Sequence, residues 1–319
     1  MKALKASIRV ALTALALSLS LGAPSRAAED EASTLTRQMK DLYQAGKYME
    51  ALPLAQKSLA LREKEFGPDD TNLAMPLNDL GTIHYNLGQY AVAEALYKRS
   101  LAIREKTPGP DTTEVATGLN NLGELYRVQE RYAEAEPLLK RSIAIREKTV
   151  GPNDPSIVMA LSNLAALYSN QSKYDQAEPL YKRGLAVLEK AHGKNDPEAT
   201  VLMNNLADAY INRHRYADAE RLLKRSIAVT EKAYGPDHPD VAQALNNLAV
   251  LYTRQGRNAD AERLFKRSVA TFEKTLGPNH PDLADILQNL AGLYKDEGRY
   301  ADAQQLFKRS MAIRGKTGA

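Results

Sequence analysis

A heptapeptide that recurs every 42 residues constrains the fold more than any other feature of this chain. Its clearest copy is Asn120–Tyr126, in which two asparagines precede a leucine, a small residue and a tyrosine three positions later. Further copies begin at Asn78, Ser162, Asn204, Asn246 and Gln288. A fixed period of about 20–50 residues is typical of repeat architectures, in which each unit packs on its neighbours. The sequence therefore predicts an elongated array with one continuous core.

Each 42-residue unit predicts two helices. In one full unit, residues 112–129 form the first helix, because Leu119, Leu122 and Tyr126 fall on one side at about 100° per residue. Residues 132–150 form the second helix, Gly151–Pro152 ends it, and Asp154–Pro155 opens the next one. The second helices are expected to open at Tyr48, Tyr90, Tyr132, Tyr174, Tyr216, Asn258 and Tyr300. The expected fold is thus an all-α solenoid of seven helix pairs.

The N-terminus predicts an export signal. Lys2, Lys5 and Arg9 precede an apolar run over residues 10–21, and Ser25–Ala27 offers small residues to a signal peptidase. We expect a signal peptide over residues 1–27, cleaved after Ala27 or one residue later, and a repeat domain over residues 28–319. The alternatives are an uncleaved anchor or a buried first helix. Cleavage predicts a periplasmic or secreted protein without a membrane span.

Charge and composition narrow the classes of function. Removing residues 1–27 lowers the number of basic residues from 43 to 39, which equals the 39 acidic residues. The mature chain therefore carries no basic excess for nucleic acid or anionic lipid. It contains no cysteine, which excludes disulfides, thiol nucleophiles and thiolate metal sites. No two of the five histidines have metal-ligand spacing, and phosphate-binding and nucleophile motifs are absent. We expect no catalytic residue, no metal and no cofactor, and thus not an enzyme.

The repeat resembles a known family. Gly123 and Ala135, with Tyr126 and Tyr132, are similar to the tetratricopeptide repeat. The stretch of residues 133–148 resembles its 42-residue form in kinesin light chains and their bacterial relatives. The resemblance covers about residues 31–317 and implies a right-handed superhelix whose first helices line a concave groove for peptides or partner proteins. Because the chain lacks a heptad coiled coil and carries an export signal, we expect no role in motor transport.

Polar columns on the first helix predict the binding residues. Asn120, Glu124 and Arg127 lie roughly opposite the buried leucines and should face the groove. An asparagine amide offers two donors and an acceptor, so a row of them can satisfy the backbone of an extended peptide. The resemblance implies the same contact; solvated surface is the alternative. The predicted groove residues are Asn78, Asn120, Glu124, Arg127, Asn204, Asp208 and Asn246.

Two further columns favour structural roles. The column of Asn121 lies at the flank of the helix, where hydrogen bonds between adjacent first helices are expected and ligand contact is the alternative. The Lys–Arg pairs, such as Lys140–Arg141, could suggest a polyanion site. Since Glu136 precedes Lys140 by four residues, in the orientation that favours a helix ion pair, a solvated outer face is expected instead.

These features predict a non-catalytic scaffold that binds an extended peptide or partner protein of unspecified identity. The alternative is a structural component that self-associates, or joins a periplasmic complex, through its repeat ends. Met311–Ile313 motivates that alternative, because no polar capping helix follows the last repeat and apolar surface is left unburied.

Overall fold

The computed structural model describes residues 26–317, and every regular element within them is a helix. Fourteen α-helices form seven hairpin pairs, which confirms the predicted count and fold class. The first helices are α1 (Arg26–Gln44), α3 (Ala74–Asn86), α5 (Thr113–Val128), α7 (Val158–Asn170), α9 (Ala199–Asn212), α11 (Pro239–Arg254) and α13 (Pro281–Asp296). The second helices are α2 (Tyr48–Phe66), α4 (Tyr90–Lys106), α6 (Tyr132–Thr149), α8 (Tyr174–His192), α10 (Tyr216–Tyr234), α12 (Asn258–Thr275) and α14 (Tyr300–Thr317).

The predicted signal peptide lies outside the described residues, apart from its last two. The cleavage point after Ala27 falls in the first turn of α1 and stays a prediction. None of the helices within residues 26–317 is both long enough and apolar enough to cross a bilayer.

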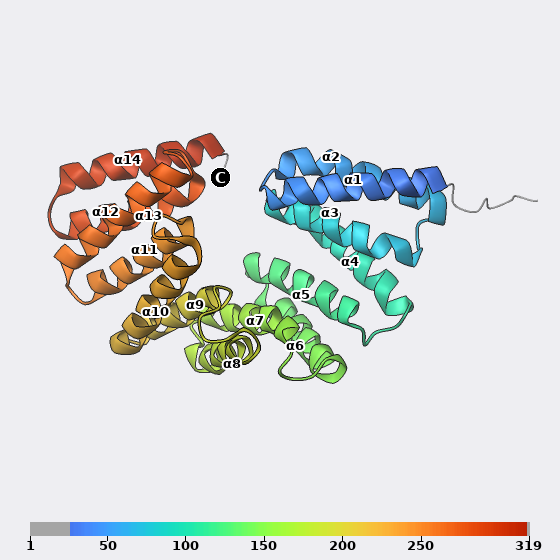
Figure 1. Ribbon diagram of the computed structural model, residues 1–319, viewed down its shortest axis with the longest axis horizontal. Coiled ribbons are helices and arrows are strands. Elements are labelled where there is room, and N and C mark those ends of the chain that lie inside the picture. The colour runs from blue at the N-terminus through green and yellow to red at the C-terminus, as the bar shows by residue number, and fades with distance from the viewer. Residues whose placement is uncertain (1–25, 318–319) are drawn as a thin grey trace, which may run out of the picture.

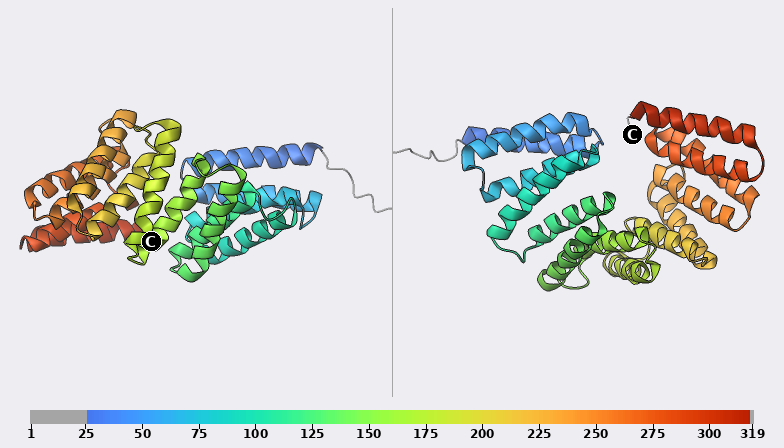
Figure 2. Two further views of the ribbon diagram at one scale, coloured as in Figure 1. Left: turned by 90° about the horizontal axis from the view of Figure 1, so that it is seen from below. Right: turned by 180° about the vertical axis from the view of Figure 1, so that it is seen from behind.

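The pairs, numbered here as repeats 1–7, stack in chain order into an open arc (Figure 1). Helices α5, α7, α9 and α11 face the inside of the arc, and α6, α8, α10 and α12 lie on its outside. Each helix packs on the next one along the chain, and first helices also touch, as in α5 with α7 and α9 with α11. The view from below places α1 and α14 at different heights, so the arc also rises as a superhelix (Figure 2). The concave surface is therefore built from the first helices.

Side-chain caps set the helix starts. Thr112 Oγ1 accepts from the Val115 amide (3.2 Å) at the start of α5, and His238 Nδ1 accepts from the Asp240 amide (3.3 Å) at the start of α11. At Asp154 the predicted helix start is displaced: a 3₁₀ turn over Pro155–Ile157 comes first, and α7 begins at Val158. Asp154 accepts from the Ser156 amide (2.9 Å) and thereby caps this 3₁₀ turn instead of the α-helix itself.

One core column shows how the stack buries its apolar face. Leu139 packs so close to Gly123 that a Cβ there would lie 2.8 Å from Leu139 Cγ, which brings α5 and α6 into tight contact. Equivalent positions in neighbouring repeats are equally covered: Phe265 is 1% exposed. The last member, Phe307, is 36% exposed. Burial of this column therefore depends on a following repeat.

Serines join the two helices within a repeat. Ser100 Oγ donates to the Ala74 carbonyl (2.6 Å) from inside the interface. The same bond forms at Ser58, Ser142, Ser268 and Ser310. Repeat 4 has Gly184 in this column, and in repeat 5 the buried Ser226 Oγ has no hydrogen-bond partner within the described part of the chain.

Glutamates of the second helices form hydrogen bonds with side chains of the next repeat. Glu94 on α4 accepts from Tyr126 Oη on α5 (3.0 Å) and from Arg131 (2.7 Å), whose guanidinium lies 4.0 Å from the Tyr126 ring centre. Lys98 closes the expected i,i+4 pair with Glu94 (2.6 Å). The tyrosine–glutamate bond recurs through to Tyr294 and Glu262 (2.8 Å). Each bond links a second helix to the following first helix.

The arginines of the Lys–Arg pairs are not simply solvated. Arg141 binds Glu105 of the preceding repeat (2.6 Å). It also donates to the Pro110 carbonyl in the loop between α4 and α5 (3.2 Å). The expectation of a solvated outer face holds for Lys140, which pairs with Glu136 on its own helix. The same expectation is incomplete for Arg141, because a helical wheel of one helix does not show contacts with the preceding repeat. The ion pair between Arg141 and Glu105 thus supports the stacking of repeats.

Candidate functional site

Hollows follow one another along the concave surface. One of about 390 Å³ lies among α3, α5 and α7 and is lined by Tyr85, Asn120, Glu124 and Met159, among others. One of about 470 Å³ lies between α9 and α11, and one of about 560 Å³ lies between α11 and α13. The last two share Val250 and Asn289. This line of hollows is the candidate binding groove.

Pairs of amides join neighbouring first helices at the floor of the groove. Asn121 Nδ2 donates to Asn78 Oδ1 (2.9 Å), and Asn163 Nδ2 donates to Asn120 Oδ1 (3.1 Å). Near the C-terminal end, Asn289 Nδ2 donates to Asn246 Oδ1 (3.0 Å). The structural role predicted for the Asn121 column is confirmed at these three junctions. The partner is the Asn120 column of the preceding repeat, which the pattern of a single helix does not identify.

This pairing covers part of the predicted amide column. Asn120 and Asn246 are only 3% and 5% exposed, whereas the sequence analysis expected them to face the groove openly. The next repeat supplies the covering side chain in each case. Both residues still line hollows, Asn120 the one of about 390 Å³ and Asn246 the one of about 470 Å³. Contact with a peptide stays a prediction for these residues and for the half-buried Asn78.

The amide pairing is interrupted around α9. The position that would pair with Asn205 is a serine, Ser162, in the preceding repeat. No side-chain hydrogen bond joins the two residues in the described structure. Asn247 Oδ1 instead accepts from Gln243 on its own helix (3.3 Å). Asn204 Oδ1 is consequently shielded from solvent without a hydrogen-bond partner in residues 26–317. The predicted groove residue Asn204 therefore differs from the other members of its column.

The charged groove residues fall into two states. Arg127 donates to both carboxylate oxygens of Glu124 (2.7 Å each), and Tyr85 Oη adds a longer bond to Glu124 (3.3 Å). These two predicted residues thus neutralise each other. Asp208 is exposed to the groove and accepts from Asn212 Nδ2 (3.2 Å), with no ion pair in the described residues. Partial desolvation raises the pKa of Asp208.

Exposed apolar side chains also lie on the first helices, and Met159 among them lines the hollow of about 390 Å³. Met75, Met159 and Val201 are 57%, 65% and 59% exposed. They occupy equivalent positions of their repeats, 42 residues apart. The predicted groove residues were all polar or charged, so these apolar positions were missed. Exposed apolar surface of this kind is a common feature of binding sites.

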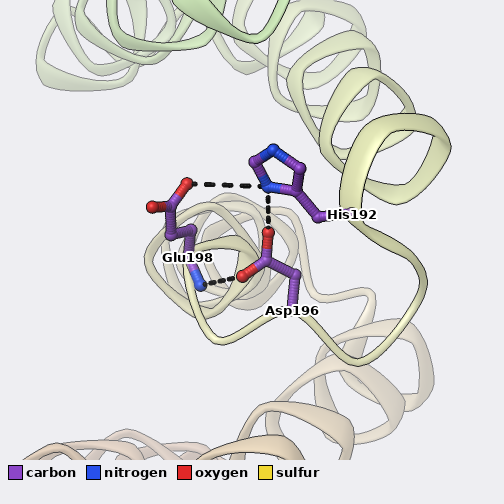
Figure 3. A group of neighbouring side chains, drawn as sticks. All are labelled: His192, Asp196 and Glu198. Atoms are coloured by element: carbon purple, nitrogen blue, oxygen red, sulfur yellow. Dashed lines mark hydrogen bonds and ion pairs between the residues drawn. The ribbon is translucent and has the colours of Figure 1, made fainter.

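One histidine–carboxylate cluster lies at the loop between α8 and α9 (Figure 3). His192 Nδ1 is 2.5 Å from Asp196 Oδ2 and 3.9 Å from Glu198 Oε2. The other oxygen of Asp196 accepts from the Glu198 amide (3.0 Å) in the turn that precedes α9. Three such side chains have the ligand types that can hold a cation. The turn contact and the hydrogen bond to His192 already explain the geometry, so we assign it no metal.

The family models match almost the whole repeat array. The tetratricopeptide repeat model matches residues 30–106, 114–190, 198–274 and 240–316, and a second model of the same description matches residues 78–148. The protein belongs to the tetratricopeptide repeat family. Among curated proteins, none matches the chain significantly.

Solved structures share the fold at low sequence identity. BtubC from P. vanneervenii is 21% identical, with a TM-score of 0.58, and the match covers 73% of this chain and 92% of that one. A Podospora anserina protein described as a kinesin light chain is 24% identical over 65% of this chain and 97% of its own, with a TM-score of 0.57. Apo RapI is 14% identical over 90% and 99%, with a TM-score of 0.70. These likenesses support the predicted relation to kinesin light chain-like repeats at the level of fold.

Proposed function

We propose that this protein is an exported, non-catalytic scaffold that binds an extended peptide, or an extended segment of a partner protein, along its concave surface. The observation that carries the proposal is the line of hollows along the first helices, lined by amides and, at Met159, by an exposed apolar side chain. Amides can bond a peptide backbone, and exposed methionine and valine side chains can bury apolar ligand groups. The fold is also shared by a Rap regulator solved in complex with the Phr* peptide (15% identity, TM-score 0.64, covering 87% of this chain and 72% of that one).

A double substitution in the groove is expected to abolish peptide capture. In Met159→Glu/Val201→Glu, two exposed apolar contacts become charges, and we expect at least a tenfold loss of affinity for peptides selected by display on the wild-type protein. Affinity is measured by fluorescence polarisation with each selected peptide. Because both side chains are already exposed, the melting temperature should change little.

The matched control is Met49→Glu/Val92→Glu on the second helices α2 and α4, where the side chains are 69% and 45% exposed. It should bind the selected peptides as the wild type does. Equal binding by both double variants, or no enriched peptide at all, would contradict the groove proposal. Alanine substitutions of Asn120 and Asn246 are less decisive, because they also break the bonds to Asn163 and Asn289.

A specific observation favours self-association as a second candidate. Phe307 and Met311 on α14 are 36% and 70% exposed, although the column of Phe307 is buried in every preceding repeat from Tyr97 onward. We expect Phe307→Ser/Met311→Ser to lower the concentration-dependent mass seen by light scattering. A wild-type protein that stays monomeric at every concentration would eliminate this function and leave the groove proposal intact.

A further inference from the structure

The hollow between α9 and α11 contains a carboxyl group that forms no ion pair within the described residues. The hollow is lined by ten residues, and Asp208 is the only one of them with an ionisable side chain. Its neighbours there are mainly amides and apolar side chains, including Asn204, Asn246 and Val250. A carboxylate in such partly desolvated surroundings is stabilised by a nearby cation.

The neighbouring cation does not fill this role. Arg254 lies on α11 close enough to lower the pKa of Asp208, yet it forms no ion pair with Asp208 among the described residues. It lines the adjoining hollow of about 560 Å³ together with Asp296. Asp208 differs in this respect from Glu124, which accepts two hydrogen bonds of 2.7 Å from Arg127. The charge of Asp208 is therefore available to a ligand.

A second acceptor lies one helical turn away on α9. Asn204 Oδ1 has no donor in the described structure, whereas the corresponding oxygens of Asn78, Asn120 and Asn246 each accept from the next repeat. The terminal torsion of an asparagine is broad, so a small rotation of the amide can present this oxygen to the hollow. Residues i and i+4 share a helix face, which places the Asn204 amide and the Asp208 carboxylate side by side.

The neighbouring members of the Asp208 column are uncharged. The column of Asp208 contains Ala166 before it, then Val250 and Gly292 after it. In the N-terminal half the same column holds Glu124, which forms an ion pair with Arg127. The volume of about 470 Å³ falls within the range of ordinary ligand sites.

We propose that the α9–α11 hollow is the subsite for a cationic group of the bound peptide, either an ammonium or a guanidinium. Asp208 acts as its counter-ion and Asn204 supplies a second acceptor. This inference rests on the proposed groove function and adds the chemistry that one position of the ligand must have. The charge-assisted hydrogen bonds to the carboxylate give the subsite its selectivity.

Small probes test the subsite apart from the rest of the groove. The purified protein is titrated with N-acetyl-lysinamide, N-acetyl-argininamide, glycinamide and the neutral N-acetyl-norleucinamide, and the ¹³C resonance of the Asp208 carboxyl is followed by NMR. We expect saturable shifts at roughly millimolar concentration for cationic probes and none for norleucinamide. Saturation by glycinamide alone assigns the cation to a peptide N-terminus, and saturation by the acetylated probes assigns it to a side chain.

Two variants complete the test, with amide resonances of α9 as the readout common to all proteins. Asp208→Asn keeps the size of the side chain and should lower the affinity for the cationic probes at least tenfold. Arg254→Gln, which removes the neighbouring charge, should bind as tightly as the wild type or more tightly. Equal responses from wild type and Asp208→Asn, or saturation by norleucinamide, or no saturable response, would overturn the proposal. Peptide display reports on the whole groove, so the two proposals can fail independently.

Discussion

Phe265→Ala is expected to cost about 3–5 kcal/mol of unfolding free energy, the range for truncating a fully buried phenylalanine. Phe265 on α12 is 1% exposed and belongs to the continuous core. Because repeats contact only their neighbours, the loss should stay near the C-terminal end of the array. We therefore expect urea unfolding, followed by circular dichroism, to split into two transitions, with repeats 6 and 7 unfolding first.

The matched substitution is Phe307→Ala, one repeat later in the same column. Phe307 is 36% exposed because no further repeat covers it within residues 26–317, and its truncation should cost only about 1–2 kcal/mol. The comparison isolates the contribution of the following repeat to the burial of this column. Equal losses for the two variants would contradict the stacking argument.

Acid is expected to destabilise the array strongly between about pH 5 and pH 2. Hydrogen bonds from Arg131, followed by those from Lys98 and Tyr126, lower the pKa of Glu94 from 4.5 to about 2. Hydrogen bonds from Lys266 and Tyr294 lower the pKa of Glu262 to about 2 as well. The pKa is also lowered at Glu136, Glu178 and Glu220. A carboxylate whose folded-state pKa is lowered stabilises the fold above its unfolded-state pKa, and this stabilisation disappears as pH falls through the folded-state pKa.

The magnitude is set first by the two glutamates with the lowest pKa values. Allowing for solvent screening, Glu94 and Glu262 each contribute roughly 1–2 kcal/mol at neutral pH, and the other three glutamates add to this stabilisation. Urea unfolding at a series of pH values measures the loss. Glu94→Gln should lower the stability at pH 7 by roughly 1–2 kcal/mol and differ little from the wild type near pH 2. A constant difference between the two proteins over this range would contradict the assignment.

The sequence was sufficient for the architecture because the period, the glycine stops and the capping residues act locally. The helix predicted over residues 112–129 is α5 (Thr113–Val128), and α6 begins at Tyr132 as predicted. The exception at Asp154 is also local, since one side chain can cap either a 3₁₀ turn or an α-helix. Local rules therefore determined the number and approximate ends of the helices.

The candidate site was only partly predictable, because exposure depends on the neighbouring repeat. The helical wheel placed Asn120 on the groove side, but it could not show that Asn163 from the next helix covers its oxygen. Arg141 likewise reaches Glu105, which is 36 residues earlier and on another helix pair. In a periodic sequence, each contact between repeats recurs at a constant sequence separation. The sequence alone does not show which separations bring two side chains together, because that depends on how the repeats stack.

The interrupted amide pairing has a mechanical consequence for the whole solenoid. Within the described residues, side-chain bonds between paired amides are missing at both junctions around α9, and the serine bond between helices is missing in repeats 4 and 5. Each repeat contacts only its neighbours, so any bending of the array concentrates at the junctions with the fewest bonds. We expect bending to occur mainly at the centre of the arc, where a small rotation at α9 changes the distance between the ends and the width of the groove. The proposed cation subsite lies at this most compliant point, so a ligand bound there would set the curvature of the molecule.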